Sequence, residues 1–311
     1  MKNPMITVFT TTYNRGYIIE NLYKSLCNQI SKDFEWVIVN DASNDNTDEL
    51  IHIWIDEGKL DIHYIRNEVR GGIANAINIG IKVAKGKLFF KMDDDDELTD
   101  DAVELLVGYE RTISGLSGFA GVSGLKSFKD GKAIGKEWRH KEKYIDATNF
   151  ERKKYNLDHD KAEVYYVHIL RKYGPFPQFE QETYAFEAIL WNRIANANLK
   201  LRWFKDKICI CEYLPDGETM HYFENCMKYF RAYSYLIDNY KDYRQVKFLQ
   251  RFEAVSKYFA VCIVKKIKFS ELRNYFNWNQ WWIGIAYICG IIIYWLRLLL
   301  KPERYKKYYN I

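Results

Sequence analysis

The chain has 311 residues, of which 17% are aromatic, and a formal net charge of +5 at pH 7. This length is enough to bury a full hydrophobic core in one large domain or two small ones. The modest charge and the lack of a zinc-finger spacing or other nucleic-acid motif argue against a nucleic-acid partner. The six cysteines form no CxxC pair, so reduced, structural thiols are expected, with Cys209 and Cys211 in the core. The first residues carry no signal-peptide pattern.

The first hundred residues alternate apolar runs of strand length with segments of helical periodicity. Strands are expected over residues 5–12, 34–40, 60–66 and 87–92. Helices are expected over residues 17–30, 47–55, 72–84 and 99–107. This alternation is typical of βαβ units, which build a mainly parallel sheet and bind ligands beyond the carboxyl ends of its strands. The expected fold class is therefore α/β.

A polar segment follows each of these four strands. The segments are Thr10–Arg15 (TTTYNR), Asn40–Thr47 (NDASNDNT), Asn67–Gly80 (NEVRGGIANAINIG) and Lys91–Glu97 (KMDDDDE). Any one of them alone is most simply a helix cap or a turn. Four such segments at successive strand ends indicate a shared binding site.

The acidic run 93–97 is the strongest chemical signal in the chain. Carboxylates crowded at the end of a buried strand repel one another, and a bound divalent cation relieves that repulsion. Oxygen ligands without nearby His or Cys favour Mg²⁺ or Mn²⁺ over Zn²⁺. A solvated acidic helix start is the alternative and would suit an isolated run better. The three other polar strand ends favour the metal.

Together the four segments resemble the nucleotide-sugar-binding half of family 2 glycosyltransferases, which have the GT-A fold. The resemblance covers about residues 5–215 and implies a Rossmann-like, mainly parallel central sheet. It implies that Asp41 reads the nucleotide base, that Asp93 contacts the ribose or the metal, and that Asp95 is a direct ligand of Mn²⁺ or Mg²⁺. The family's Ala-Arg-Asn is Ala-Ile-Asn here, so Arg70 is an alternative source of the arginine. The other donor-binding residues that the resemblance implies are Thr11, Tyr13, Arg15, Asn75, Asn78 and Asp94.

Residues 174–195 place a proline-rich loop before an amphipathic helix. An inverting sugar transfer needs a carboxylate that takes the proton of the attacking hydroxyl. In the resembled family this base begins the helix with the L/V-W-x-R-I/L-A pattern, which implies Glu187, four positions before Trp191. A carboxylate there is also simply a favourable first-turn residue. Glu180 and Glu182 are alternative bases, and Glu182 is also a candidate cap of that helix.

The segment 213–219 (YLPDGET) resembles one that lies near the donor diphosphate in the family. His221 follows it and is a candidate ligand of the metal or of a phosphate; a plain surface histidine is the alternative. We place a domain boundary here, with a catalytic domain over residues 1–219 and a helical region over residues 220–311.

The helical region ends in a long uncharged stretch, Asn274 to Leu296, with tryptophans and tyrosines at both ends. This aromatic placement resembles the interfacial belts of membrane segments. Basic residues on both flanks suggest that both ends stay beside anionic lipid, so residues 274–300 are expected to be an interfacial or re-entrant anchor and not a crossing helix. A hydrophobic helix packed on the rest of the protein is the alternative.

The resemblance thus implies a metal-dependent inverting glycosyltransferase of bacterial cell-surface polysaccharide synthesis. The expected donor is a UDP-sugar, as is common in the resembled family, and the expected acceptor is a hydroxyl of a glycan or lipid-linked glycan. The expected location is the cytoplasm, peripherally on the cytosolic face of the membrane. A sugar nucleotidyltransferase is an alternative, but it would show a Gly-rich basic loop after its first strand. A non-catalytic membrane adaptor is the other alternative, and the intact acidic run argues against it.

Overall fold

The computed structural model describes residues 3–212, 221–274 and 281–300. Residue contacts divide the chain into two compact units, each considered separately below. Unit 1 comprises residues 1–176 and 190–213, and unit 2 comprises residues 177–189 and 214–311. Residues 177–189, which sequence alone groups with the N-terminal domain, therefore have most of their contacts within unit 2.

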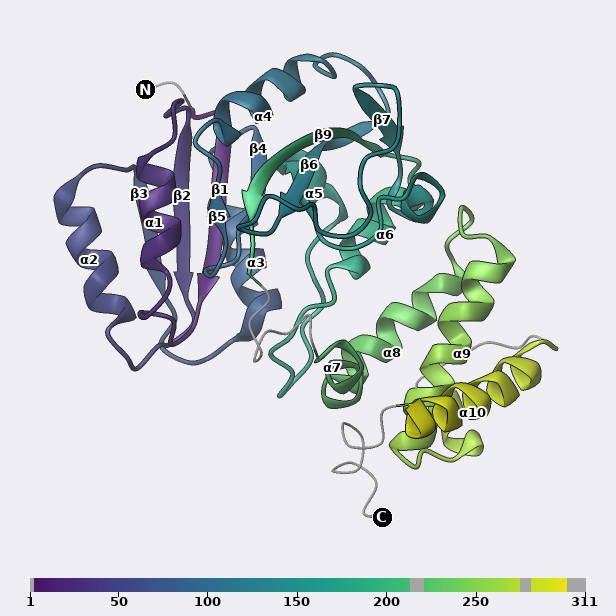
Figure 1. Cartoon of the computed structure of the whole chain (residues 1–311). Coiled ribbons are helices and arrows are strands. Elements are labelled where there is room, and N and C mark those ends of the chain that lie inside the picture. Colours follow the sequence, from purple (N-terminus) through teal and green to yellow (C-terminus); the bar gives the residue numbers. More distant parts are fainter. Residues whose placement is uncertain (1–2, 213–220, 275–280, 301–311) are drawn as a thin grey trace. The chain divides into compact units, whose positions relative to one another are not determined.

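Unit 1 is built on one nine-stranded sheet (Figure 1). Its strand order is β3-β2-β1-β4-β8-β6-β9-β5, with β7 paired to β9. The first four strands in this order are parallel, and β8 is antiparallel to both β4 and β6. The strands are β1 (Ile6–Thr12), β2 (Phe34–Asn40), β3 (Ile62–Arg66), β4 (Leu88–Lys91), β5 (Glu97–Leu98), β6 (Phe119–Ser127), β7 (Tyr144–Ala147), β8 (Lys161–Tyr166) and β9 (Lys200–Ile210).

Helices cover both faces of the parallel strands. On one face, Trp36 of β2 stacks with Trp54 of α2, and Tyr23 of α1 stacks on Trp54 with ring centroids 4.4 Å apart. Phe9 of β1 is one position past the residue that pairs with Trp36, so its side chain points to the other face. There α3 packs so closely that a Cβ added at Gly80 would lie 2.3 Å from the Phe9 ring. The helices are α1 (Glu20–Cys27), α2 (Thr47–Glu57), α3 (Gly72–Val83), α4 (Ala102–Arg111), η1 (Asn149–Tyr155), α5 (Val167–Tyr173) and α6 (Ala188–Asn196), the last of which contains the division between the units.

The stretch 144–172 alternates basic and acidic residues, a pattern that usually indicates a solvated surface, but part of it is buried. It contains β8, which lies in the middle of the sheet between β4 and β6. The charges within it have buried partners: Lys161 is 3% exposed and donates to three backbone carbonyls, and Glu163 pairs with Arg152 at 2.6 Å. Composition alone does not show this burial, because it does not record that backbone carbonyls and Arg152 meet these charges in the fold.

The runs 199–205 and 208–214 have the sequence pattern of two separate strands, but the structure has a single strand there, β9. Asp206 and Lys207 read as a turn in the sequence, but Lys207 stays in the ladder opposite Leu125 of β6. Register shifts in this pairing absorb the polar residues without ending the strand.

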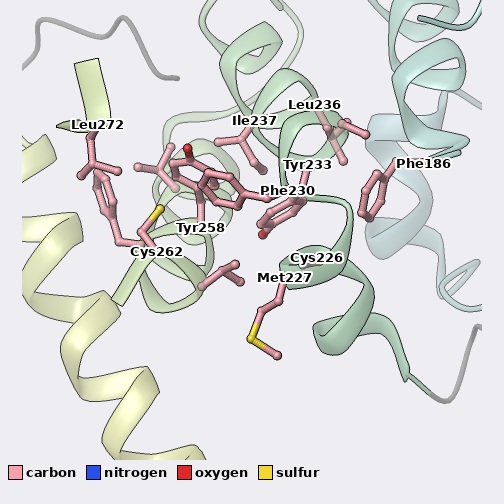
Figure 2. Packing of buried hydrophobic residues seen from close by; sticks show 14 of the residues in the cluster. Phe186, Cys226, Met227, Phe230, Tyr233, Leu236, Ile237, Tyr258, Cys262 and Leu272 are labelled. Atoms are coloured by element: carbon pink, nitrogen blue, oxygen red, sulfur yellow. The ribbon is translucent and has the colours of Figure 1, made fainter. Parts of the chain in front are cut away.

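Unit 2 is helical, as predicted, and has an aromatic core. Phe230 and Tyr258 stack with centroids 5.6 Å apart, and Tyr258 is completely buried. Cys226, Met227 and Cys262 belong to the same buried cluster (Figure 2). The helices are α7 (Tyr222–Lys228), α8 (Phe230–Asp238), η3 (Asn239–Lys241), α9 (Phe248–Val264), η4 (Phe269–Asn274) and α10 (Ile283–Leu300). Within the described ranges, no helix combines the length and apolarity that crossing a bilayer requires.

Candidate donor-binding site

The carboxyl ends of β1, β2, β3 and β4 meet at one edge of the sheet of unit 1. The amide of Asp41 donates to the Thr12 carbonyl at 2.9 Å, and the amide of Met92 donates to the Phe9 carbonyl at 2.8 Å. The amide of Asn67 donates to the last carbonyl of β2 at 2.9 Å. These bonds carry the parallel ladders past the strand ends, so the four polar segments of the sequence lie along one edge.

The loops after β1 and β2 are bonded directly to each other. The backbone amide of Asn14 donates to Ser43 Oγ at 2.9 Å, and the side-chain oxygen of Asn14 accepts from the backbone amide of Asn44 at 2.8 Å. Asn14 and Ala42 have φ of 54° and 65°, in the left-handed region, which asparagine adopts readily but alanine does not. Strain of this kind persists only where surrounding bonds enforce it, and it is concentrated at functional sites.

Asp41 is buried and accepts three hydrogen bonds of 2.8 Å. Its Oδ1 accepts from Asn67 Nδ2 and from the amide of Gly71, and its Oδ2 accepts from the amide of Gly72. A carboxylate has about four acceptor positions. Oδ2 therefore keeps one acceptor position with no partner among the described residues. This geometry gives a rigidly held acceptor suited to one incoming N–H group.

The aromatic and basic residues implied for the donor pocket lie beside these loops. The guanidinium of Arg70 stands 3.9 Å from the ring centroid of Tyr13. Arg15 donates to the hydroxyl of Tyr17 at 2.6 Å. Burial would lower the pKa of Arg15, but Asp94 and other acidic neighbours raise it above its usual value. Arg70, the alternative arginine, is thus paired with a residue of the predicted pocket.

Two asparagines of α3 have structural partners. Asn78 accepts the amide of Phe176 at 2.8 Å and donates to the carbonyl of the same residue at 2.9 Å. Asn75 lies under Gly71, where an added Cβ would come within 2.4 Å of the Asn75 amide nitrogen. Thr11 is half-buried near the end of β1. Asn78 therefore holds the start of the proline-rich loop, and Asn75 packs closely against the turn that bonds Asp41.

Two lysines partly neutralise the acidic run. Lys91 pairs with Asp93. Lys126 of β6 places its Nζ 2.7 Å from Asp96 and 3.8 Å from Asp93, and its side chain is only 12% exposed. Burial would raise the pKa of Asp93, but these two ammonium groups lower it to about 2. Sequence reasoning missed Lys126; its only local signal is one cation in the otherwise uncharged run 118–128.

Asp94 and Asp95 remain poorly compensated. Desolvation raises the pKa of Asp94 to about 7, with further contributions from Asp95 and Asp93. Desolvation, Asp93 and Asp96 raise the pKa of Asp95 to about 6. Three cations, including Arg15, thus face four carboxylates in this cluster. Hard oxygen donors with surplus negative charge are the chemistry that Mg²⁺ and Mn²⁺ bind, so the residues present fit such an ion.

A second group beside this run has softer chemistry. Cys209 Sγ lies 3.6 Å from both Asp96 and Cys211 Sγ, and the three potential ligand atoms lie within 4.8 Å of one another. Burial raises the pKa of the Cys209 thiol well above its usual value, so the thiol stays protonated. Asp96 is already bonded to Lys126. Both cysteines are buried, as predicted from the sequence.

The candidate base and its alternatives lie in unit 2. Glu187 is half-buried and directly precedes α6, whereas Glu180 is exposed. The carboxylate of Glu182 accepts the amides of Arg231 and Ala232, each at 2.8 Å. Glu182 therefore caps α8 and not the helix that the sequence suggested. His221 directly precedes α7; the segment 213–220 before it lies outside the described residues.

The family model for glycosyl transferase family 2 matches residues 7–174, more than half of the chain. The chain belongs to glycosyltransferase family 2. The match includes all four strand ends described above and the buried strand β8. The resemblance inferred from the four polar segments is thereby confirmed.

Two bacterial enzymes are among the curated relatives that the chain matches. The chain is 37% identical over 102 residues to the chondroitin synthase of Pasteurella multocida, covering 33% of this chain and 10% of that protein. It is 31% identical over 105 residues to a Campylobacter jejuni enzyme, GalNAc(5)-diNAcBac-PP-undecaprenol beta-1,3-glucosyltransferase, covering 33% and 34%. The matched segment spans about a third or less of either relative's length.

Solved structures establish the GT-A fold. Staphylococcus aureus TarS 1–349 in complex with UDP-GlcNAc is similar with a TM-score of 0.60 at 18% identity, over 93% of this chain and 89% of that one. The mannosyltransferase PcManGT of Pyrobaculum calidifontis, in complex with GDP-Man and Mn²⁺, is similar with a TM-score of 0.58 at 15% identity, over 98% and 83%. The predicted α/β sheet and helical C-terminal region are both part of this likeness.

Proposed function

We propose that this chain is a metal-dependent inverting glycosyltransferase whose donor is a UDP-sugar. The observation that carries the proposal is the carboxylate of Asp41, fixed by three donors with one acceptor position left, on the same sheet edge as the acidic run. The imide N–H of uracil is a donor that matches this acceptor. The structural relative TarS, solved with UDP-GlcNAc, supports the same donor class.

The donor would lie across the strand ends. Tyr13 and Arg15 would flank the nucleotide, and Asp93 would contact the ribose or the metal. Asp95 would hold Mn²⁺ or Mg²⁺, with Asp94 beside it and His221 as a further ligand of the ion or a phosphate. Such an ion, when bound, supplies positive charge that stabilises the departing diphosphate.

The acceptor would be a hydroxyl of a glycan or lipid-linked glycan in cell-surface polysaccharide synthesis. Glu187 would take the proton of that hydroxyl as its oxygen attacks the anomeric carbon and the bond to the diphosphate breaks. The names of the relatives support this acceptor class. We further propose that the chain works on the cytosolic face of the membrane, which its uncharged C-terminal stretch and basic flanks support.

Thermal unfolding of the full chain with UDP and GDP, with and without Mn²⁺, tests donor and metal together. UDP with Mn²⁺ should stabilise the protein because a ligand well above its Kd adds a few kcal/mol to folding stability. Asp95→Ala should abolish the Mn²⁺-dependent part. Asp100→Ala, a change at an exposed carboxylate nearby, should not. No shift with any nucleotide would instead favour a non-catalytic adaptor.

The base assignment has its own test. Glu187→Gln should lower kcat by about 10²–10⁴-fold and leave UDP binding unchanged, since a base acts on the acceptor proton. Glu180→Gln, at an exposed carboxylate in the same loop, is the matched control. If Glu180→Gln abolishes turnover and Glu187→Gln does not, the assignment to Glu187 is wrong. Because donor binding is measured separately, a wrong assignment of the catalytic base would not contradict the proposed donor site.

A further inference from the structure

Helix α10 and the turn before it present an apolar stripe to solvent. Successive members of the stripe are one, three or four positions apart, which places them on one side of a helix. No charged residue occurs between positions 281 and 296. The members, with their exposed fractions, are Trp281 (81%), Ile285 (49%), Ile288 (57%), Ile292 (52%), Trp295 (57%) and Leu296 (50%). We call this set the α10 stripe.

The opposite side of α10 is used in the core of unit 2. Trp282 is 3% exposed and Ala286 is completely buried. A Cβ added at Gly290 would lie 2.7 Å from the Cβ of Phe259 on α9, so the two helices are in close contact there. These contacts fix the rotation of α10. Within unit 2 the helix therefore cannot bury the stripe by turning about its own axis.

Two further large apolar residues are exposed at the start of α9. Phe248 is half-exposed, Leu249 is 75% exposed, and the Phe248 ring contacts Trp282 with centroids 5.5 Å apart. Single exposed apolar residues are common on protein surfaces, but a contiguous patch of large ones marks an interaction surface. The α10 stripe is therefore suited to contact with a partner that is itself apolar.

The sequence on both flanks of the stripe is basic, which favours one kind of apolar partner over others. Residues 265–311 contain nine lysines and arginines and only two acidic residues. Three of these lysines, Lys265, Lys266 and Lys268, are exposed in the turn after α9. A second copy of the chain would bring two such basic regions together, which is unfavourable. An anionic lipid surface complements both the charge and the apolar side chains.

The residues near the two ends of the α10 stripe also favour a lipid surface as the partner. Trp281 and Trp295 stand near its two ends, and tryptophan favours the boundary between headgroups and acyl chains. A helix with this arrangement lies parallel to the bilayer plane. We propose that the α10 stripe docks this chain on an anionic lipid surface, with α10 lying in the interface. This assigns a surface to the membrane location proposed above.

Flotation of the full chain with lipid vesicles tests the assignment. Wild type should float with vesicles of phosphatidylcholine and phosphatidylglycerol, and more weakly with phosphatidylcholine alone. Ile288→Glu/Ile292→Glu should reduce binding to the mixed vesicles at least about tenfold, because charged side chains are expensive to bury in lipid. Lys266→Gln/Lys268→Gln should remove most of the preference for anionic lipid. Leu116→Glu, at an exposed leucine of unit 1, is the matched control and should bind like wild type.

UDP-induced thermal stabilisation of each variant separates docking from the donor site and from misfolding. Ile288→Glu/Ile292→Glu should retain the wild-type shift, since both side chains point outward. Unchanged flotation of this folded variant would overturn the proposal. Sedimentation equilibrium without lipid gives the other refuting outcome: a wild-type dimer that this variant dissociates, with no vesicle binding, would assign the stripe to self-association.

Discussion

Replacing Lys126 by methionine tests whether the acidic run depends on a built-in cation. The ammonium lies 2.7 Å from Asp96, and the two side chains are only 12% and 6% exposed. Methionine keeps the length of the side chain and removes its charge. Removing one partner of a buried ion pair costs about 3–5 kcal/mol, because the remaining charge is left uncompensated. An exposed pair would contribute about 1 kcal/mol or less.

Urea unfolding followed by tryptophan fluorescence measures this cost, with Asp96→Asn and the double variant completing a cycle. The double variant should lose less stability than the sum of the two single variants, by about 2 kcal/mol. Lys129→Met is the matched control: Lys129 is 60% exposed and bridges two carboxylates, so its loss should cost about 1 kcal/mol or less. A loss below about 1 kcal/mol for Lys126→Met, or a cycle without coupling, would refute the reasoning.

Three further predictions concern pH, the base-reading carboxylate and packing. In the folded, ion-free protein, desolvation raises the pKa of Asp94 to about 7 and that of Asp95 to about 6. In the unfolded chain both carboxyls have the ordinary pKa of 3.8, so they lose their protons at lower pH there than in the folded protein. Ion-free stability should therefore fall as pH rises from about 4 to about 7, and Mn²⁺ should raise Tm more at about pH 8 than at about pH 5. Asp41→Asn should weaken UDP binding at least about tenfold in calorimetry, because an amide oxygen cannot accept all the N–H groups that now bond this carboxylate. Gly80→Ala should cost about 1–3 kcal/mol in urea unfolding, because its Cβ would meet a β1 phenylalanine ring at 2.3 Å. Gly108→Ala, in open space on α4, should stabilise by about 0.5–1 kcal/mol.

Each of these predictions has a contradicting result. If the effect of Mn²⁺ on Tm is independent of pH, Asp94 and Asp95, whose pKa values are raised, do not bind the ion. If Asp41→Asn binds UDP as tightly as wild type, another residue recognises the nucleotide base. Equal effects of the two glycine substitutions would show that α3 does not need close contact with the sheet.

Local patterns determined the parallel part of the fold and the place of the donor site. Apolar runs alternating with helical segments permit only βαβ units, and the carboxyl ends of parallel strands meet at one edge. The polar residues directly after four such strands therefore lie along the same edge of the sheet, whatever the fold of the rest of the chain. Asp41 and the acidic run could therefore be located from the sequence, together with the family whose motifs they share.

Tertiary structure alone decided what holds these residues in place. Lys126 neutralises Asp96 across 30 positions of sequence, and Asn78 bonds Phe176 across 98. Strand β8 reads as charged surface, yet it lies in the middle of the sheet, where Lys161 bonds the Ile134 carbonyl 27 positions away and Glu163 pairs with Arg152. These pairings follow from which strands become neighbours and which loops meet. Strand order depends on the packing of the whole chain, and no local pattern of residue types records it.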